Sequence, residues 1–137
     1  MESNYIFVYG LLKSIYDNDP ARFIRKNSTL IGEAFFPGIL IDIGTYPGAI
    51  YEPGSQTKVH GEVYRIDQNY KELVAFLDHF EGVGDQYKQP NEYIREVISV
   101  QIDEKNILAS CYLYNWNYDV TKVIASGRYE NKKGNRN

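Results

Sequence analysis

The sequence predicts an α+β fold in which a curved, mostly antiparallel sheet or partial β-barrel carries two main helices. Strand-length apolar segments, separated by turn signals, occupy most of the chain. Helical signals are confined to residues 19–27 and 68–80, and these two helices interrupt a series of strands. No linker or internal repeat divides the chain, so we expect a single domain over residues 1–130 and a flexible polar tail over residues 131–137.

The bulk composition excludes several classes of protein. The chain has 137 residues, of which 43% are hydrophobic and 24% charged, as in an ordinary soluble globular domain. Its net charge is -3 and no basic stripe recurs, so no nucleic-acid partner is expected, because duplex binding depends on neutralising phosphates. The N-terminus lacks a signal-peptide pattern and no segment reaches membrane-spanning length, so we expect a cytoplasmic protein with no membrane partner. The single cysteine, Cys111, lies in an apolar run and is expected to be buried.

The first expected elements are a strand and a short helix. A short apolar run that is rich in β-favouring side chains stops at Gly10 ("NYIFVYG", residues 4–10). This pattern predicts a buried strand followed by a tight loop. In the helix that follows, "DPARFIRKN", Asp19 is predicted as the N-cap and Pro20 as the first helical residue, where a missing N–H is tolerated.

Further strands are expected on both sides of the second helix. Residues 29–67 contain strand-length segments punctuated by three turn or bulge signals, Pro37-Gly38, Pro47-Gly48 and Pro53-Gly54. Two longer segments follow the second helix, "EYIREVISVQID" and "NILASCYLYNW". The short polar link at Glu104-Lys105 joins them, which predicts a long β-hairpin.

The second helix places one carboxylate near its apolar face. Apolar residues recur at helical spacing at Leu73, Phe76, Leu77 and Phe80. At about 100° per residue, Glu81 falls at the margin of this face, whereas Asp78 and His79 point more toward solvent. If the helix reaches Glu81, partial desolvation raises the pKa of its carboxyl above the reference of about 4.3, which suits proton exchange near neutral pH. The alternative is a frayed, solvated glutamate beside a glycine C-cap.

Two other patterns bear on ligand binding. The loop in "VYGLLK", residues 8–13, follows a strand and contains a glycine, so its backbone N–H groups are candidates for cradling an anion or an oxyanion. Such a glycine also serves as a simple turn. Asp78, Glu81 and Asp85 lie close in sequence, but no histidine joins them on the same face, so we expect no metal site.

Seven segments together resemble the γ-glutamylcyclotransferase-like family, which includes γ-glutamylamine cyclotransferases and AIG2-like proteins. In family order they are "FVYGLLK" (7–13), "YPGAI" (46–50), "GEVYRID" (61–67), "LDHFEG" (77–82), "YIREVISV" (93–100), "CYLYNW" (111–116) and "SGRY" (126–129). Each segment alone is unspecific, but seven in the correct order, spread over nearly the whole chain, are hard to obtain by chance. The resemblance implies a γ-glutamylcyclotransferase-like fold.

The resemblance also implies roles for individual residues. In the family, the glutamate of the "LDxFE" segment is the catalytic acid/base, and this residue corresponds to Glu81. The family loop after the first strand binds the γ-glutamyl moiety; the matching residues here are Tyr9, Gly10, Leu11 and Leu12. Leu11 stands where the family usually carries Thr or Ser, so the backbone donors are kept and a hydroxyl is lost.

Two further tyrosines are implied as substrate-binding residues. Tyr46, in "TYPGA", is expected to line the pocket, although a tyrosine before a proline also covers a bend. Tyr129, in "SGRY", is expected to close over the ligand, or else to anchor the tail.

The reaction implied by the resemblance is an intramolecular aminolysis. The α-amino group of a small γ-glutamyl amide attacks its own γ-carbonyl, which closes 5-oxoproline and expels an amine or amino acid, with Glu81 moving the protons. No metal and no organic cofactor are implied, and the oligomeric state is left open. Two alternatives stand beside this enzyme: a catalytically silent small-molecule or protein-binding module of the same fold, and another acyl-transfer or hydrolytic activity that uses the same glutamate.

Overall fold

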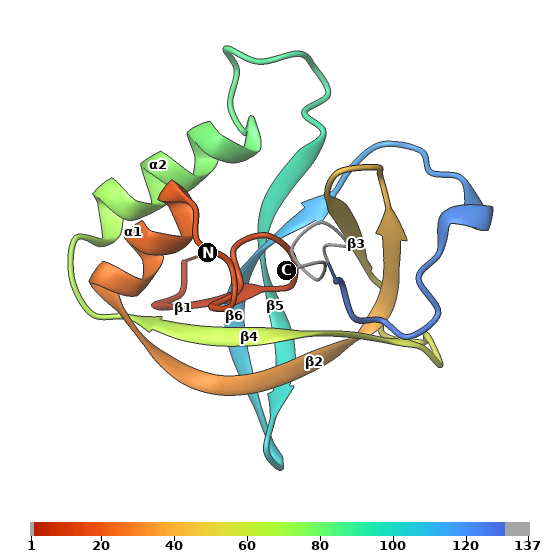
Figure 1. The fold of residues 1–137 in the computed structure, drawn as a ribbon, viewed down its shortest axis with the longest axis horizontal. Coiled ribbons are helices and arrows are strands. Elements are labelled where there is room, and N and C mark those ends of the chain that lie inside the picture. The colour runs from red at the N-terminus through yellow and green to blue at the C-terminus, as the bar shows by residue number, and fades with distance from the viewer. Residues whose placement is uncertain (1, 131–137) are drawn as a thin grey trace.

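The computed structural model describes residues 2–130 (Figure 1). This part of the chain contains six strands, two α-helices and one short 3-10 helix, joined by loops. In chain order they are β1 (Tyr5–Val8), α1 (Asp19–Asn27), β2 (Ser28–Asp42), β3 (Pro47–Tyr51), β4 (Lys58–Ile66), α2 (Tyr70–Glu81), β5 (Tyr93–Ile102), β6 (Lys105–Tyr114) and η1 (Val120–Lys122). The predicted tail, residues 131–137, lies outside the described residues. In the described chain, neither α-helix has the length and apolar content needed to cross a membrane.

The strands form one curved sheet that closes on itself. Its order is β3-β2-β4-β1-β6-β5, and β2 also pairs with β5 at Phe35 and Gln101. Five strands therefore complete a barrel, and β3 extends from β2 outside it. All neighbouring strands are antiparallel except β1 and β6, which run parallel. The predicted α+β fold with a mostly antiparallel, barrel-like sheet and two helices is confirmed, and so is the long hairpin, formed by β5 and β6.

β1 is buried on both faces, which explains its continuous apolar run. Phe7 belongs to the apolar cluster inside the barrel, whereas Ile6 and Val8 belong to a second cluster that includes Leu73 and Leu77 of α2. The two helices lie side by side and cover this outer face of the sheet (Figure 1). The fold thus has one core inside the barrel and another beneath the helices. Cys111 is fully buried in the barrel core, as predicted.

The start of α1 differs by one residue from the prediction. Asn18, not Asp19, is the N-cap, because its side-chain oxygen accepts a hydrogen bond from the N–H of Ala21 (2.9 Å). Asp19 is the first helical residue and forms an ion pair with Arg22. Both positions carry a residue that favours N-caps, and the sequence pattern alone did not separate them.

Two of the three predicted turn or bulge signals lie within strands. Pro37-Gly38 is in the middle of β2, where pairing passes from β4 to β3: Pro37 is opposite Lys58, and Gly38 is opposite Tyr51. A proline is tolerated there because the strand changes its partner at that point. Pro47-Gly48 begins β3, whereas Pro53-Gly54 does form a turn.

The buried face of α2 is rotated relative to the prediction. Leu73 and Leu77 are fully buried, but Phe76 and Phe80 are 37% and 48% exposed. Phe76 packs edge to face on Phe23 of α1, with ring centroids 5.1 Å apart. Because the buried face is centred nearer Leu77 than predicted, Glu81 lies inside it rather than at its margin.

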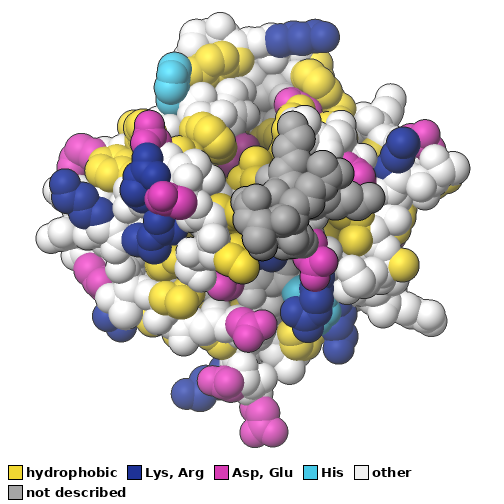
Figure 2. Space-filling model, viewed as in Figure 1, with side chains coloured by type: hydrophobic (Ala, Val, Ile, Leu, Met, Phe, Trp, Pro, Cys, Tyr) yellow, Lys and Arg dark blue, Asp and Glu magenta, His cyan; other side chains and the backbone are white. Residues whose placement is uncertain are grey.

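Charged side chains of both signs are interspersed over the face drawn in Figure 2. On this face the basic side chains over α1 alternate with acidic ones and form no continuous stripe. The absence of a nucleic-acid partner stays a prediction.

The two sides of α2 are expected to differ in their contribution to stability. Leu77→Ala removes a fully buried side chain and should lower the free energy of unfolding by about 2–5 kcal/mol. Phe76→Ala, the matched control on the exposed margin, should cost roughly 1 kcal/mol despite removing more atoms. Urea denaturation followed by circular dichroism measures both, and an equal or larger loss for Phe76→Ala would contradict the helix orientation.

Candidate active site

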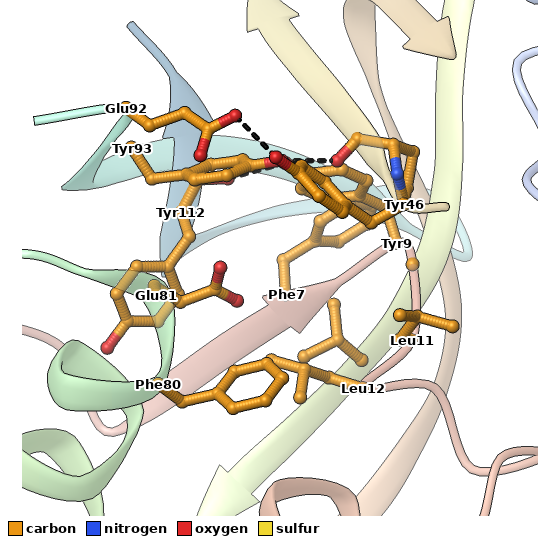
Figure 3. Close-up of a pocket in the computed structure, with 13 residues that line it drawn as sticks. Phe7, Tyr9, Leu11, Leu12, Tyr46, Phe80, Glu81, Glu92, Tyr93 and Tyr112 are labelled. Carbon is orange, nitrogen blue, oxygen red and sulfur yellow. Dashed lines mark hydrogen bonds between the residues drawn. The ribbon is translucent and has the colours of Figure 1, made fainter. Parts of the chain in front are cut away.

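A cavity of about 230 Å³ lies beside the C-terminal end of α2. Its walls come from segments far apart in the chain, at residues 7–12, 46–47, 80–81, 92–93 and 112. Figure 3 shows the Glu81 carboxylate directed into the cavity, with Glu92 and Tyr93 above it and Phe80 and Leu12 below it. The volume is smaller than the range of about 300–1,000 Å³ that is typical for drug-sized ligands, so the cavity suits a small molecule.

The C-cap of α2 fixes Glu81 at the last helical position. Gly82 adopts left-handed backbone angles (φ 70°, ψ 34°), and its N–H donates to the carbonyl oxygen of His79 (3.2 Å). The N–H of Val83 donates to the carbonyl oxygen of Asp78 (2.8 Å). These two bonds form a Schellman motif, which requires a residue that tolerates a positive φ. Glu81 is therefore held in an ordered turn and does not adopt the frayed, solvated alternative.

The carboxyl of Glu81 has a strongly shifted pKa. Desolvation, which is the larger cause, and the negative charge of Glu92 together raise the pKa of Glu81 to about 7. Burial is also the main cause that raises the pKa of Tyr9, Tyr93 and Tyr112 above the usual value. For Tyr46, burial together with the hydrogen bond to Glu92 and nearby negative charge raises the pKa to about 12. The tyrosine hydroxyls are thus protonated at pH 7, and Glu81 is poised to gain and lose a proton.

Asp78 ties the last turn of α2 to the β5–β6 hairpin. Its carboxylate accepts hydrogen bonds from Arg95 Nε (2.9 Å) and Nη2 (3.1 Å) and from the Tyr112 hydroxyl (2.7 Å). The expectation that Asp78 points toward solvent is wrong, because its side chain is only 22% exposed and lies against the sheet. This contact holds the turn that presents Glu81 to the cavity.

The loop after β1 forms the facing wall. Tyr9 is buried, and its hydroxyl donates to the carbonyl oxygen of Tyr112 (2.7 Å). Gly10 leaves room for Pro47, since a Cβ at Gly10 would lie 2.7 Å from the Pro47 Cγ. Leu11 and Leu12 also line the cavity, and within residues 2–130 their backbone N–H groups have no hydrogen-bond acceptor.

The two remaining predicted tyrosines lie in different places. Tyr46 lines the cavity, and its hydroxyl donates to Glu92 Oε2 (2.7 Å). Tyr129 lines a separate polar cavity with Lys13. Its hydroxyl donates to the carbonyl oxygen of Thr45 (3.1 Å), and its own carbonyl oxygen accepts from Lys13 Nζ (2.9 Å). The structure therefore brings Glu81, the 9–12 loop and Tyr46 together, and it places Tyr129 outside that group as an anchor of the C-terminal segment.

Seven residues that line the cavity were not predicted as site residues from the sequence: Phe7, Val8, Pro47, Phe80, Glu92, Tyr93 and Tyr112. Alternation along the β5–β6 hairpin is a usable signal for Tyr93 and Tyr112, which both lie in the cluster beneath the helices. No pattern marks Glu92, because its position depends on the path of the loop after α2. Residues 2–130 contain no group of three or more His, Cys, Asp or Glu placed to hold a metal ion; the expectation of no metal stays a prediction.

Residues 6–131 match the protein family described as gamma-glutamyl cyclotransferase, AIG2-like. The chain belongs to this family. A relative within it, the gamma-glutamylcyclotransferase family protein YtfP of Escherichia coli (strain K12), is 36% identical over 123 residues, which cover 89% of this chain and 92% of that protein. The resemblance drawn from seven sequence segments is confirmed, and the chain is a γ-glutamylcyclotransferase-like enzyme by family.

Solved structures of this γ-glutamylcyclotransferase-like fold superpose closely. An AIG2-like protein from Mus musculus has a TM-score of 0.70 at 23% identity, over 95% of this chain and 90% of that one. YkqA from Bacillus subtilis has a TM-score of 0.67 at 24% identity, over 92% of this chain, and this chain spans 39% of the YkqA chain. At such identities the likeness shows the fold, which is the one predicted.

The contribution of the Asp78 contact to the free energy of unfolding should be measurable. Asp78→Ala leaves Arg95 and Tyr112 without their common acceptor, so we expect the free energy of unfolding to fall by about 2 kcal/mol. Asp85→Ala is the control, because it removes an exposed carboxylate from the loop just after α2. Urea denaturation compares the two variants, and equal stabilities would show that the contact does not hold the helix end.

Proposed function

We propose that this chain is a γ-glutamyl-amide cyclotransferase that releases 5-oxoproline together with an amine or amino acid. Glu81 is the general acid/base of this proposal, and the 9–12 loop with Tyr46 binds the substrate. The observation that carries the proposal is a single one: a carboxyl whose pKa is near 7 shares a small cavity with the backbone of that loop.

Glu81 moves two protons in the proposed reaction. The α-ammonium of the γ-glutamyl half first gives a proton to the Glu81 carboxylate, and the free amine then attacks the γ-carbonyl carbon. A new C–N bond forms and closes a five-membered ring. The tetrahedral intermediate collapses as Glu81 returns this proton to the departing nitrogen, which breaks the original amide bond. The second proton of the ring nitrogen then passes through the Glu81 carboxylate to the released amine, which leaves as an ammonium. A carboxyl with a pKa near 7 suits both steps, because neither protonation state is strongly favoured at neutral pH.

The loop after β1 is the proposed oxyanion site. Attack on the γ-carbonyl places negative charge on its oxygen, and the free N–H groups of Leu11 and Leu12 are the proposed donors to that oxygen. Loss of one such donor typically costs about 2.7–4 kcal/mol of transition-state stabilisation. Because these donors belong to the backbone, the replacement of the family's Thr or Ser by Leu11 leaves them in place.

The tyrosines supply shape more than chemistry. The Tyr9 hydroxyl donates a hydrogen bond to the backbone oxygen of Tyr112 (2.7 Å), and the Tyr93 hydroxyl donates one to the backbone oxygen of Pro47 (2.7 Å). Their rings are thereby fixed as walls. Rigid walls favour a folded substrate in which nucleophile and carbonyl are already close, which is the main requirement of an intramolecular reaction.

One observation favours a second candidate, a catalytically silent binding module of the same fold. Leu11 presents an apolar side chain to the cavity where the family usually carries a hydroxyl. A relative that binds a related ligand without converting it would tolerate this change. The two candidates differ in whether the wild-type protein forms any 5-oxoproline.

The catalytic role of Glu81 is tested by Glu81→Gln. The neutral amide cannot accept a proton, so 5-oxoproline release from a panel of γ-glutamyl amines and γ-glutamyl amino acids should fall by at least about 100-fold. Glu96→Gln, which neutralises an exposed carboxylate on β5, is the matched control and should keep wild-type turnover. Glu81→Gln should fold at least as stably at pH 8, because it removes a desolvated charge. Full turnover by Glu81→Gln refutes the mechanism, and a wild type inactive on the whole panel favours the binding module.

The pH dependence should report the raised pKa of Glu81. The carboxylate form is the active base, and below pH 7 this group becomes protonated, so kcat/KM should fall on the acid side with a midpoint near pH 7. The facing tyrosines stay protonated through this range and do not contribute. Initial rates between pH 5 and 8.5, with folding checked by circular dichroism, give the midpoint. A midpoint near 4.5 would mean that Glu81 is solvated during the reaction.

A further inference from the structure

The cavity that holds Glu81 carries an unbalanced charge. Two carboxylates, Glu81 and Glu92, line it, and among residues 2–130 no Lys, Arg or His does so. Glu92 belongs to no ion pair within the described chain. Lys88, from the same loop, places its Nζ over the Trp116 ring instead, 5.2 Å from the centroid. Two like charges in one small cavity are unfavourable, and the repulsion is relieved either when Glu81 takes up a proton or when a positive group enters between the two carboxylates.

Glu92 is held in place by contacts on both sides. The Tyr46 hydroxyl donates to Glu92 Oε2 (2.7 Å), and the backbone oxygen of Glu92 accepts from the N–H of Asn115 (2.7 Å). The preceding residue, Asn91, is tied to Gly84 by two bonds, from the Gly84 N–H to Oδ1 (2.9 Å) and from Nδ2 to the Gly84 oxygen (3.0 Å). The loop after α2 therefore delivers a fixed carboxylate, with Oε1 free of any partner in residues 2–130.

We propose, building on the function proposed above, that Glu92 is a specificity residue that binds a cationic group on the amine half of the γ-glutamyl substrate. Glu81 must face the reacting nitrogens, so the α-ammonium of the glutamyl half belongs beside Glu81. Glu92 lies on the other wall with Tyr46 and Tyr93 (Figure 3). A second positive charge there pairs with the free Oε1 and separates the two carboxylates.

The same charge arrangement discriminates against anionic leaving groups. The amine half of a γ-glutamyl amino acid carries an α-carboxylate, which would meet Glu92 with no cavity cation to compensate. The favoured substrate class is thus the γ-glutamyl monoamide of a diamine, whose free ammonium lies at the far end of the amine half.

A matched pair of substrates tests this proposal. The γ-glutamyl amide of 1,4-diaminobutane ends in an ammonium, and that of n-pentylamine ends in a methyl group on a chain of equal length. Wild-type kcat/KM should favour the cationic substrate by about tenfold, a typical effect of one partly desolvated charge pair. In Glu92→Gln this ratio should fall to about one, and in the control Glu96→Gln, on the exposed side of β5, it should stay at the wild-type value.

Two further measurements separate charge recognition from a structural role. Tyr46→Phe keeps the Glu92 charge but frees the side chain, so the ratio should fall only part of the way to one. In Glu92→Gln the acid limb of the pH profile should move below pH 7, because a charge that raises the Glu81 pKa is gone. An unchanged ratio in Glu92→Gln overturns the assignment, as does a wild type that shows no cationic preference.

The outcome for Glu92 is distinguishable from the outcome for the proposed function. The Kd of each γ-glutamyl probe, measured by calorimetry on wild type and on Glu92→Gln, gives the same cationic-to-neutral ratio without turnover. If the Kd ratio depends on Glu92 but the protein forms no 5-oxoproline, the role of Glu92 is supported and only the proposed cyclotransferase activity is refuted. If the protein turns over γ-glutamyl substrates but binds the two probes with equal Kd values, only the role of Glu92 is refuted. If the protein binds neither probe, both proposals are refuted.

Discussion

The contact between Asp78 and the β5–β6 hairpin is the interaction on which the candidate site depends. A two-pronged hydrogen bond from Arg95 and a third bond from Tyr112 hold the last turn of α2 against the sheet. The Gly82 cap ends the helix at this turn and fixes the backbone of Glu81, so the Glu81 side chain starts from a position that faces the cavity. Desolvation of Glu81, and hence its raised pKa, follows from this docking rather than from any partner of the carboxylate itself.

Closure of the barrel brings the other wall of the site to Glu81. β1 lies between β4 and β6, and its parallel pairing places Ile6 opposite Ser110. The loop that leaves β1 therefore emerges beside Tyr112, two residues further along β6, and the Tyr9 hydroxyl bonds to the backbone there. A parallel pair needs a long crossover connection, and the intervening segment carries both helices and β5. One topological feature thus unites the loop, α2 and the hairpin around a single cavity.

Most of the fold follows from local sequence patterns, whereas the site follows only in part. Glu81 could be singled out because periodicity and the glycine after it are local features, and the ordered segments then tied it to a family. Asp78 was misplaced because the polar side chain finds Arg95, seventeen positions away, and periodicity assigns polar residues to solvent. Glu92 was missed because the path of the loop after α2 brings it to the cavity, and no periodic pattern of apolar residues predicts that path. Tyr129 also lies in one of the seven family segments, yet its hydroxyl bonds to the backbone of Thr45 and its side chain lies outside the cavity of Glu81.

The cavity offers a substrate both backbone N–H groups and side chains, and this distinction decides what the replacement of a hydroxyl residue by Leu11 would change. Leu11, Leu12 and Phe80 belong to its apolar part, and Glu81, Glu92 and Tyr46 belong to its polar part (Figure 3). If the loop acts through its N–H groups, a side chain at Leu11 changes the shape of the cavity but leaves its donors intact. Turnover and selectivity are then separable: the helix end and the loop backbone set the chemistry, and the side chains around them set which amine can leave.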